Sequence, residues 1–384
     1  MADSPKFDLV VYGATGFTGQ LICEHLNLTY GVNGDINWAM AGRSQSKLEQ
    51  VRDELGVDSS VELLVADTTD QASVNTLVSS TKVLISAVGP YQQYGSDVVK
   101  ACAEHGTDYV DLCGEPAWMH EMIGKYHAIA KSNGARIVFS CGFDSIPFDM
   151  GVYFLQQAAQ QQLGGPVSRI KCRVRDLNGM ASGGTVASFM ATMAAAKESP
   201  ELFHVLGNPF ALTADFKGPE QPAGDKPIFE DDINSWSGPF IMAMINTKNV
   251  HRSNYLLGHQ YGENFVYDEM VLMGSGKEPA SLGEGMGFDT SLKPGEGPSK
   301  AQREAGLYDI VFYGTASDGQ TIQASVKGDL DPGYGSTSKI IAEAGICLLE
   351  NTTTEGGCLT SAPAMGSALI ERLQNKAGLI FSVE

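Results

Sequence analysis

The sequence is poor in positive charge and has no long apolar run. It has 26 Lys and Arg residues against 45 Asp and Glu, a formal net charge of −19 over 384 residues. A surface this acidic repels nucleic acid and anionic lipid, so we expect no nucleic-acid partner. The most apolar later stretch, 186–196, is shorter than the roughly 20 residues that span a bilayer. We therefore expect no transmembrane segment, which leaves only peripheral association with a membrane or lipid open.

Cysteine is also scarce and irregularly placed. The seven cysteines are odd in number and form no pair with metal-ligand spacing: Cys23, Cys102, Cys113, Cys141, Cys172, Cys347 and Cys358. The N-terminus lacks the charged and then apolar pattern of a signal peptide. We therefore expect no metal site and a reducing, cytoplasmic location.

The most informative segment is 8–19, where three glycines follow a short apolar run. Residues 9–12 read as a β-strand, and a helical pattern begins directly after the last glycine. Such a strand, turn and helix N-terminus are typical of a pyrophosphate-binding site. The first glycine permits the turn, the second lets the backbone approach the phosphate, and the third lets the helix pack on the strand. We predict a dinucleotide site formed by Gly13, Thr15, Gly16, Phe17, Thr18 and Gly19.

The residues after the second expected strand, 36–41, indicate which dinucleotide binds. An NAD site usually has a carboxylate here, which accepts hydrogen bonds from the ribose 2′-hydroxyl. This chain instead has Arg43, Ser44 and, one helical turn later, Lys47. A guanidinium can pair with a 2′-phosphate and stack on adenine. We therefore predict NADP rather than NAD, the alternative being a solvated loop arginine beside a helix-capping serine.

The first 150 residues alternate between apolar runs and helical stretches. Further strands are expected at 61–66, 83–88, 108–113 and 136–141, with helices at 46–55, 70–78, 95–105 and 117–133. This alternation predicts an α/β domain with a doubly wound parallel sheet, a Rossmann domain. Ligands bind at the carboxyl ends of such strands. At these ends we place four more cofactor residues: Asp67, Val88, Gly89 and Pro90. A plain strand-end turn explains Asp67 equally well.

The pattern changes after residue 150. Strand-like segments suit a mixed or antiparallel sheet, and we expect them at 169–176, 240–245, 264–273, 307–316 and 320–328. Residues 182–185 should open the helix of 186–196, and closing helices are expected at 334–350 and 362–374. Two long segments read as irregular, 207–239 and 274–303, and the second suggests a mobile loop that can serve as a lid. We place the domain boundaries at 1–150, 151–333 and 334–384.

Together these motifs resemble the saccharopine dehydrogenase-like oxidoreductases, a family that includes the trans-acting enoyl reductases. The resemblance spans nearly the whole chain and rests on seven segments: 11–19, 41–44, 89–91, 114–115, 142–147, 182–185 and 356–357. It implies a Rossmann domain, a second α/β domain with a mixed sheet, and terminal helices that return to the first domain. Saccharopine reductases usually open the fingerprint with glycine-x-glycine, whereas this chain has Gly13-Ala14-Thr15-Gly16. This departure favours the enoyl-reductase branch: a reductase, expected to be a homodimer, of an unsaturated acyl or related lipid-like small molecule.

Hydride transfer needs a proton donor or an oxyanion partner near the nicotinamide. The candidates at strand ends are Tyr91, Glu115, Cys141 and Asp144, and Arg252 of the second domain could clamp a substrate carboxylate or thioester. Each has a structural alternative, because Tyr91 can pack under the cofactor, Asp144 can cap a helix and Arg252 can pair with an acid. We expect the pocket between the two domains, with 89–91, Glu115, 142–147 and residues near Arg252 as its walls.

Other functions remain open or are excluded. Short-chain dehydrogenases use a tyrosine with a lysine four residues later, and no tyrosine here has one. A semialdehyde dehydrogenase would use Cys141 as its nucleophile, but the asparagine-proline approach usual there is missing. A saccharopine-type amino-acid dehydrogenase and an NADP-binding sensor or scaffold without chemistry both remain, since the fingerprint reports cofactor binding alone.

Overall fold

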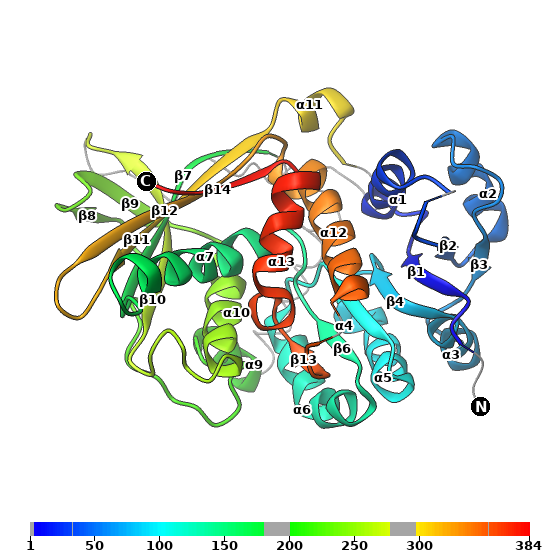
Figure 1. Ribbon diagram of the computed structural model, residues 1–384, viewed down its shortest axis with the longest axis horizontal. Helices are drawn as coiled ribbons and strands as arrows, with labels where there is room; N and C mark the ends of the chain where they lie inside the picture. The colour runs from blue at the N-terminus through cyan, green and yellow to red at the C-terminus, as the bar shows by residue number, and fades with distance from the viewer. Residues whose placement is uncertain (1–3, 33, 180–199, 277–296, 352) are drawn as a thin grey trace.

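A computed structural model of the chain describes residues 4–32, 34–179, 200–276, 297–351 and 353–384 (Figure 1). Two seven-stranded sheets build the two halves of the molecule, the first on the right of Figure 1 and the second on the left. Helices α12 (Thr337–Glu350) and α13 (Ser361–Lys376) lie between them. The predicted domain boundaries at residues 150 and 333 stay a prediction.

The first sheet is parallel throughout and has the strand order β13-β6-β5-β4-β1-β2-β3. Apart from β13, this is the order of a Rossmann fold, in which the topology reverses beside β1. The fold-class prediction is confirmed. Its strands are β1 (Phe7–Tyr12), β2 (Trp38–Gly42), β3 (Leu63–Val65), β4 (Thr81–Ser86), β5 (Asp108–Asp111), β6 (Arg136–Val138) and β13 (Gly357–Leu359).

Helices cover both faces of this sheet. Both faces must be covered because alternate side chains along each strand point to opposite faces and both sets are buried. Leu9 and Val11 of β1 face one core and Val10 and Tyr12 face the other. Helices α1 and α12 pack on the first face, and α3, α5 and α6 on the second. The helices of this half are α1 (Phe17–Thr29), α2 (Gln45–Glu54), α3 (Gln71–Ser79), α4 (Tyr91–Tyr94), α5 (Ser96–His105) and α6 (Pro116–Asn133).

The second sheet is mixed, with the order β14-β12-β11-β7-β10-β9-β8. Only the β7–β10 pair is parallel; the other neighbours are antiparallel. The last strand of the chain thus completes this sheet, whereas β13 completes the first. Its strands are β7 (Arg169–Asn178), β8 (Ile228–Glu230), β9 (Ser235–Pro239), β10 (Val266–Gly274), β11 (Leu307–Thr315), β12 (Thr321–Gly328) and β14 (Leu379–Val383).

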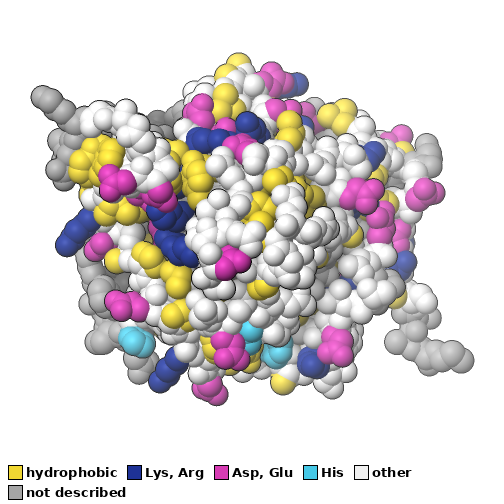
Figure 2. All heavy atoms as spheres, turned by 60° about the vertical axis from the view of Figure 1, so that its left-hand side comes forward, with side chains coloured by type: hydrophobic (Ala, Val, Ile, Leu, Met, Phe, Trp, Pro, Cys, Tyr) yellow, Lys and Arg dark blue, Asp and Glu magenta, His cyan; other side chains and the backbone are white. Residues whose placement is uncertain are grey.

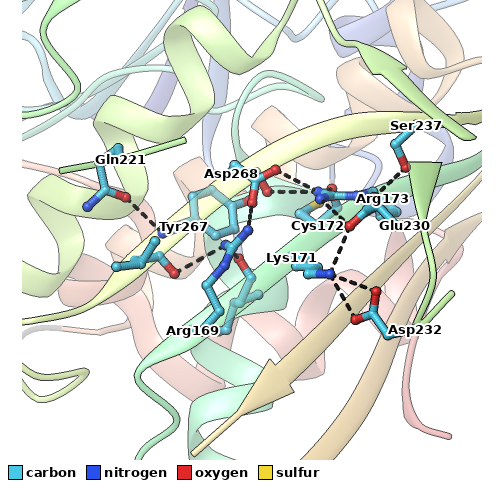
Figure 3. Close-up of polar contacts among 12 residues, drawn as sticks. Arg169, Lys171, Cys172, Arg173, Gln221, Glu230, Asp232, Ser237, Tyr267 and Asp268 are labelled. Atoms are coloured by element: carbon cyan, nitrogen blue, oxygen red, sulfur yellow. Dashed lines mark hydrogen bonds and ion pairs between the residues drawn. The ribbon is translucent and has the colours of Figure 1, made fainter. Parts of the chain in front are cut away.

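The two faces of the second sheet differ in chemistry. Ile170, Cys172 and Val174 of β7 point to the inner face and join the core that includes α7. Lys171 and Arg173 alternate with them and point to the outer face. Figure 3 shows the outer network, in which Arg173 lies between Glu230 and Asp268. The surface view in Figure 2 shows acidic and basic side chains mixed with small apolar patches on this side of the molecule.

The remaining helices connect the halves. Helix α7 packs on the second sheet and on α13, and α10 packs on α7, α13 and β10. Their bounds, with those of the short elements, are α7 (Ile146–Gln162), α9 (Pro200–Gly207), α10 (Ala243–Leu256), α11 (Lys300–Glu304) and the π-helical turn η1 (Pro332–Ser336). No helix among the described residues is both long and apolar enough to span a bilayer.

Two predictions in the second half are wrong. Residues 240–245, expected as a strand, instead lead into α10 and begin its first turn. The segment 207–239, expected to be irregular, contains β8 and β9. Helix α10 is buried on several sides, so its polar residues are buried too and its helical period is hidden in the sequence. The helix expected at 186–196, its opening residues 182–185 and most of 274–303 lie outside the described residues.

Candidate active site

The glycine turn after β1 has the geometry that the sequence predicts. Gly13 has a φ of +92°, and a Cβ there would lie 3.0 Å from the backbone of Ala87. A Cβ on Gly19 would overlap the carbonyl oxygen of Gly13. Position 13 needs glycine because its backbone is left-handed. Position 19 needs glycine because α1 packs against the turn there without room for a side chain.

The N-terminus of α1 is open to an anion. Its N-cap is Gly16, no side chain caps it, and its first turn carries no acid. By contrast, Ser44 caps α2 and Asp70 caps α3. Backbone N–H groups and the helix dipole at α1 are therefore available to a phosphate. We call the glycine turn 13–19, with the N-terminus of α1, the cradle; it fits the pyrophosphate of a dinucleotide.

The residues expected at the adenosine end lie together after β2 and β3. Arg43 and Lys47 are exposed at the start of α2, and the Ser44 hydroxyl accepts a hydrogen bond from the Lys47 N–H at 3.4 Å. Hydrogen bonds from Thr69 lower the pKa of Asp67, and the nearby charge of Arg43 adds to this effect. Ser44 and Asp67 thus both have local structural roles; their contact with the cofactor stays a prediction.

The loop after β4 packs against the glycine turn. Val88 Cγ2 lies 3.0 Å from the point where a Cβ on Gly13 would sit. The Glu115 carboxylate accepts hydrogen bonds from the backbone N–H groups of Tyr91 and Gln92, at 2.9 and 2.7 Å. Glu115 therefore holds the turn that begins at Gly89 and Pro90 beside the cradle.

Tyr91 is buried and already engaged. Its hydroxyl donates to the Ser86 carbonyl and accepts from the Leu112 N–H, both at 3.0 Å. Its ring packs on Trp118, with centroids 5.7 Å apart. Burial raises the pKa of this phenol well above its usual value, with nearby Asp111 adding to the shift. These contacts support its packing role, and a direct chemical role stays a prediction.

Arg252 lies in α10 and is also buried. Its two terminal nitrogens donate to the carbonyl oxygens of Leu212 and Cys358, so it ties α10 to a loop and to β13. Burial lowers its pKa to about 10. The structure gives it structural partners, and its predicted clamp on a substrate stays a prediction.

Asp144 differs from the other three candidates. It lies in the turn 142–147 after β6, one residue before the N-cap Ser145 of α7. Its Oδ1 atom is buried and has no hydrogen-bond partner among the described residues. Burial raises the pKa of this carboxyl to about 7. A carboxyl group that stays protonated near neutral pH can donate a proton.

Cys141 does not have the environment of a nucleophile. All seven cysteines lie in the described part of the chain, and each is a buried free thiol. Burial raises the pKa of Cys141 well above its usual value, and the charge of Asp111 raises it further. Because the thiolate is the reactive form, this argues against the semialdehyde dehydrogenase alternative.

The sequence reading missed a group of buried polar residues beside Asp144. They are Asn246 and Asn249 on α10 and Tyr267 and Glu269 on β10, and Asn249 donates to the hydroxyl of Ser145 in the predicted turn 142–147. A signal was present, because the two asparagines stand three residues apart and Glu269 interrupts an apolar strand face. The signal of the asparagines was hidden by the wrong assignment of α10.

The fold and the cradle define a class of protein. A parallel sheet in Rossmann order, an open helix N-terminus after a glycine turn, and a carboxyl with a raised pKa in the turn after β6 are the parts of a dinucleotide-dependent oxidoreductase. The sequence profile of the saccharopine dehydrogenase NADP binding domain matches residues 9–138.

Similarity to known proteins extends over the whole chain. A Mycobacterium tuberculosis protein provisionally named trans-acting enoyl reductase is 38% identical and aligns over 97% of both chains. The trans-acting enoyl reductase of Mycobacterium ulcerans is 35% identical over 98% of this chain and 97% of its own. The structure of a saccharopine dehydrogenase (L-Glu forming) from Saccharomyces cerevisiae superposes with a TM-score of 0.58 over 98% and 99% of the two chains, at 12% identity.

The chain therefore belongs to the saccharopine dehydrogenase-like family, together with the proteins named trans-acting enoyl reductases. It is an NADP-dependent oxidoreductase, which confirms the predicted family, enzyme class and cofactor. The yeast structure confirms the two-sheet fold.

Proposed function

We propose that the protein reduces the carbon–carbon double bond of an unsaturated acyl thioester with NADPH. The observation that carries this proposal is similarity over the full length to proteins named enoyl reductases. The position of Asp144 supports it, because reduction of such a bond requires a proton donor as well as a hydride. Aromatic rings adjoin this turn, which suits an apolar acyl chain: Phe143 packs on Phe148 and Tyr308, with centroids 5.3 and 4.9 Å apart.

The glycine turn and the open N-terminus of α1 would hold the pyrophosphate, and Arg43 with Lys47 would pair with the 2′-phosphate. Glu115 fixes the loop of Val88, Gly89 and Pro90 against the cradle. When bound, NADPH supplies the hydride. Asp144 would give its proton to the α-carbon of the substrate, because burial raises its pKa to about 7 and a protonated form is therefore present at neutral pH.

Oxidation of NADPH by defined substrates tests the proposal. We expect a 2-enoyl thioester to oxidise bound NADPH and its saturated counterpart to leave it unchanged. Turnover of saccharopine or its precursors, with none of enoyl thioesters, would establish the amino-acid alternative instead. Binding of NADPH without oxidation by either class would indicate a sensor or scaffold.

We also propose that the protein acts in the cytoplasm as a homodimer on a small-molecule substrate. Free buried thiols suit a reducing compartment, and the net charge of −19 suits neither nucleic acid nor an anionic lipid surface. Light scattering of the purified protein measures its mass, and a monomer at working concentration would contradict the dimer. Co-sedimentation with neutral lipid vesicles tests peripheral lipid association.

A further inference from the structure

The cradle carries no positively charged side chain of its own. Residues 13–20 include neither lysine nor arginine. A pyrophosphate is strongly anionic, and the helix dipole offers only about half an elementary charge at the N-terminus of α1. Arg43 and Lys47 are expected at the 2′-phosphate, at the adenosine end of the cofactor. A cation that faces the pyrophosphate therefore has to come from another segment of the chain.

Phe17, the first residue of α1, is contacted by segments that follow strands of the second sheet. Tyr334 of η1 packs edge-on against its ring, with centroids 5.1 Å apart. A Cβ on Gly297 would lie 2.4 Å from Phe17 Cε1, so the backbone at Gly297 lies directly against the ring. Arg303 of α11 places its guanidinium carbon over the same ring, 5.6 Å from the centroid. A cation from the second half thus lies beside the N-terminus of α1.

Backbone groups, rather than an acid, hold Arg303 in place. Its Nη1 atom donates to the Pro298 carbonyl at 2.8 Å, and its own carbonyl accepts from the Asp331 N–H at 2.9 Å. No acid among the described residues forms an ion pair with Arg303, although Asp331 lies nearby. The Asp331 carboxylate is already engaged, because it accepts hydrogen bonds from the N–H groups of Tyr334 and Gly335 at 2.9 and 2.7 Å.

The guanidinium of Arg303 keeps donors available to an anion. The side chain is half-buried, and its Nε and Nη2 atoms have no hydrogen-bond partner within the described part of the chain. A cation withdrawn from water is costly unless an anion pairs with it. A guanidinium over an aromatic ring is oriented by the ring, while the N–H groups at its edge can meet phosphate oxygens.

We propose that Arg303 is a cofactor-binding residue whose guanidinium pairs with the pyrophosphate of NADP, and that Phe17 is the positioning residue that orients it. The cofactor is then held jointly by the glycine turn of the first half and a cation of the second. This inference goes beyond the proposed function, because it concerns binding of the dinucleotide and does not depend on which substrate is reduced.

The variant Arg303→Met tests the pairing, because methionine keeps an unbranched apolar stem against Phe17 but has no guanidinium. NADPH and NADH should both bind about tenfold more weakly, since both lose a charge-assisted contact to the pyrophosphate. The nucleotide 2′-AMP has the 2′-phosphate but no pyrophosphate, so its Kd should not change. Isothermal titration calorimetry measures all three ligands, and the Tm of the apo protein is the control for folding.

Lys300→Met is the matched control on the same helix. It removes an exposed cation one turn before Arg303, where Lys300 Nζ lies 3.8 Å from Glu304, and we expect wild-type Kd values for all three ligands. Arg43→Ala should show the complementary pattern, with weaker binding of NADPH and 2′-AMP and unchanged binding of NADH.

Ionic strength separates a charge pair from a packing role. Added salt should weaken NADH binding more steeply in the wild type than in Arg303→Met, because the variant lacks a cation that salt can screen. Equal slopes would overturn the proposal, as would an unchanged Kd of NADH in folded Arg303→Met, a loss confined to NADPH and 2′-AMP, or an equal loss in Lys300→Met. If Arg303→Met fails to fold, Arg303→Gln, which can still donate to the Pro298 carbonyl, carries the same expectations.

Discussion

The outer and inner faces of the second sheet both bury carboxyl groups, but the pKa of these groups shifts in opposite directions on the two faces. On the outer face Arg173 contacts both oxygens of Glu230, at 2.6 and 3.0 Å, and Asp268 at 2.9 Å (Figure 3). Burial alone would raise the pKa of Glu230, yet Arg173 and its other donors lower it to about 2. On the inner face burial prevails, and the pKa of Glu269 rises to about 8.

This contrast separates polar burial that stabilises the fold from polar burial that is available for chemistry. On the outer face Arg173 pairs with Glu230, whose pKa is lowered to about 2, so Glu230 cannot exchange a proton near neutral pH. Glu269 accepts hydrogen bonds from the neutral groups of Tyr267 and Asn246, and Asp144 Oδ1 has no hydrogen-bond partner among the described residues. Perturbed carboxyl groups of this kind are typical of functional sites.

The largest expected effect is at Asp144, in the turn after β6. Asp144→Asn removes the proposed proton donor while keeping its shape, so kcat for an enoyl thioester should fall by about 10²- to 10⁴-fold. The Kd of NADPH and the fold should be retained, since Asp144 lies outside the glycine cradle. Stopped-flow oxidation of NADPH, with circular dichroism as the control for folding, measures both. Wild-type kcat in the variant would exclude Asp144 from the reaction.

The outer face should respond in stability rather than in rate. Arg173→Met leaves Glu230 and Asp268 buried without their cation, which should destabilise the protein by about 3 to 5 kcal/mol. Urea denaturation measures this change. The pH profile of kcat/KM should keep its wild-type shape below the unfolding transition. A shifted profile at full stability would show that the outer network tunes the inner carboxyls.

The pH dependence of stability should reveal the raised pKa of Asp144. Asp144 has a folded-state pKa of about 7, above its ordinary value of 3.8. Its contribution to stability is therefore fully present below about pH 4 and is lost as the pH rises to about 7, because the folded state retains a proton that the unfolded state releases. Asp144→Asn should remove this loss. Unfolding free energies of the two proteins that stay parallel from pH 4 to pH 8 would contradict the raised pKa.

A smaller effect is expected at the loop beside the cradle. Glu115→Gln weakens two charge-assisted hydrogen bonds to Tyr91 and Gln92, which should cost about 1 to 2 kcal/mol of stability. NADPH should bind several-fold more weakly, since the loop of Gly89 and Pro90 loses its anchor. Thermal unfolding and fluorescence titration provide the two measurements. An unchanged Tm would mean that the loop is held by other contacts.

The smallest effect concerns cofactor choice. Arg43→Ala should reduce the preference for NADPH over NADH by about tenfold, or about 1.4 kcal/mol, because it removes the guanidinium expected to pair with the 2′-phosphate. Lys47→Ala, in the first turn of α2, provides a comparison and should have a weaker effect. Fluorescence titration with both cofactors measures it. Equal selectivity in Arg43→Ala and the wild type would place the 2′-phosphate elsewhere.

The sequence predicted the phosphate-binding turn better than it predicted the roles of the polar residues around it. The spacing of Gly13, Gly16 and Gly19 reflects local steric demands, which a sequence pattern records directly. The engagement of Tyr91, Glu115 and Arg252 depends on backbone groups distant in the chain, which no local pattern records. The asparagines of α10 were missed because α10 is buried on several sides and loses its amphipathic period.

Isotope labelling of the product tests the central claim, that a hydride from the cofactor and a proton from Asp144 together reduce an unsaturated acyl thioester. Single turnover with NADPH deuterated on the nicotinamide, in ordinary water, should place deuterium on the β-carbon. Unlabelled NADPH in heavy water should place deuterium on the α-carbon, at a rate that Asp144→Asn lowers by about 10²-fold or more. Product without deuterium from the cofactor, or equal rates in the variant and the wild type, would contradict the account.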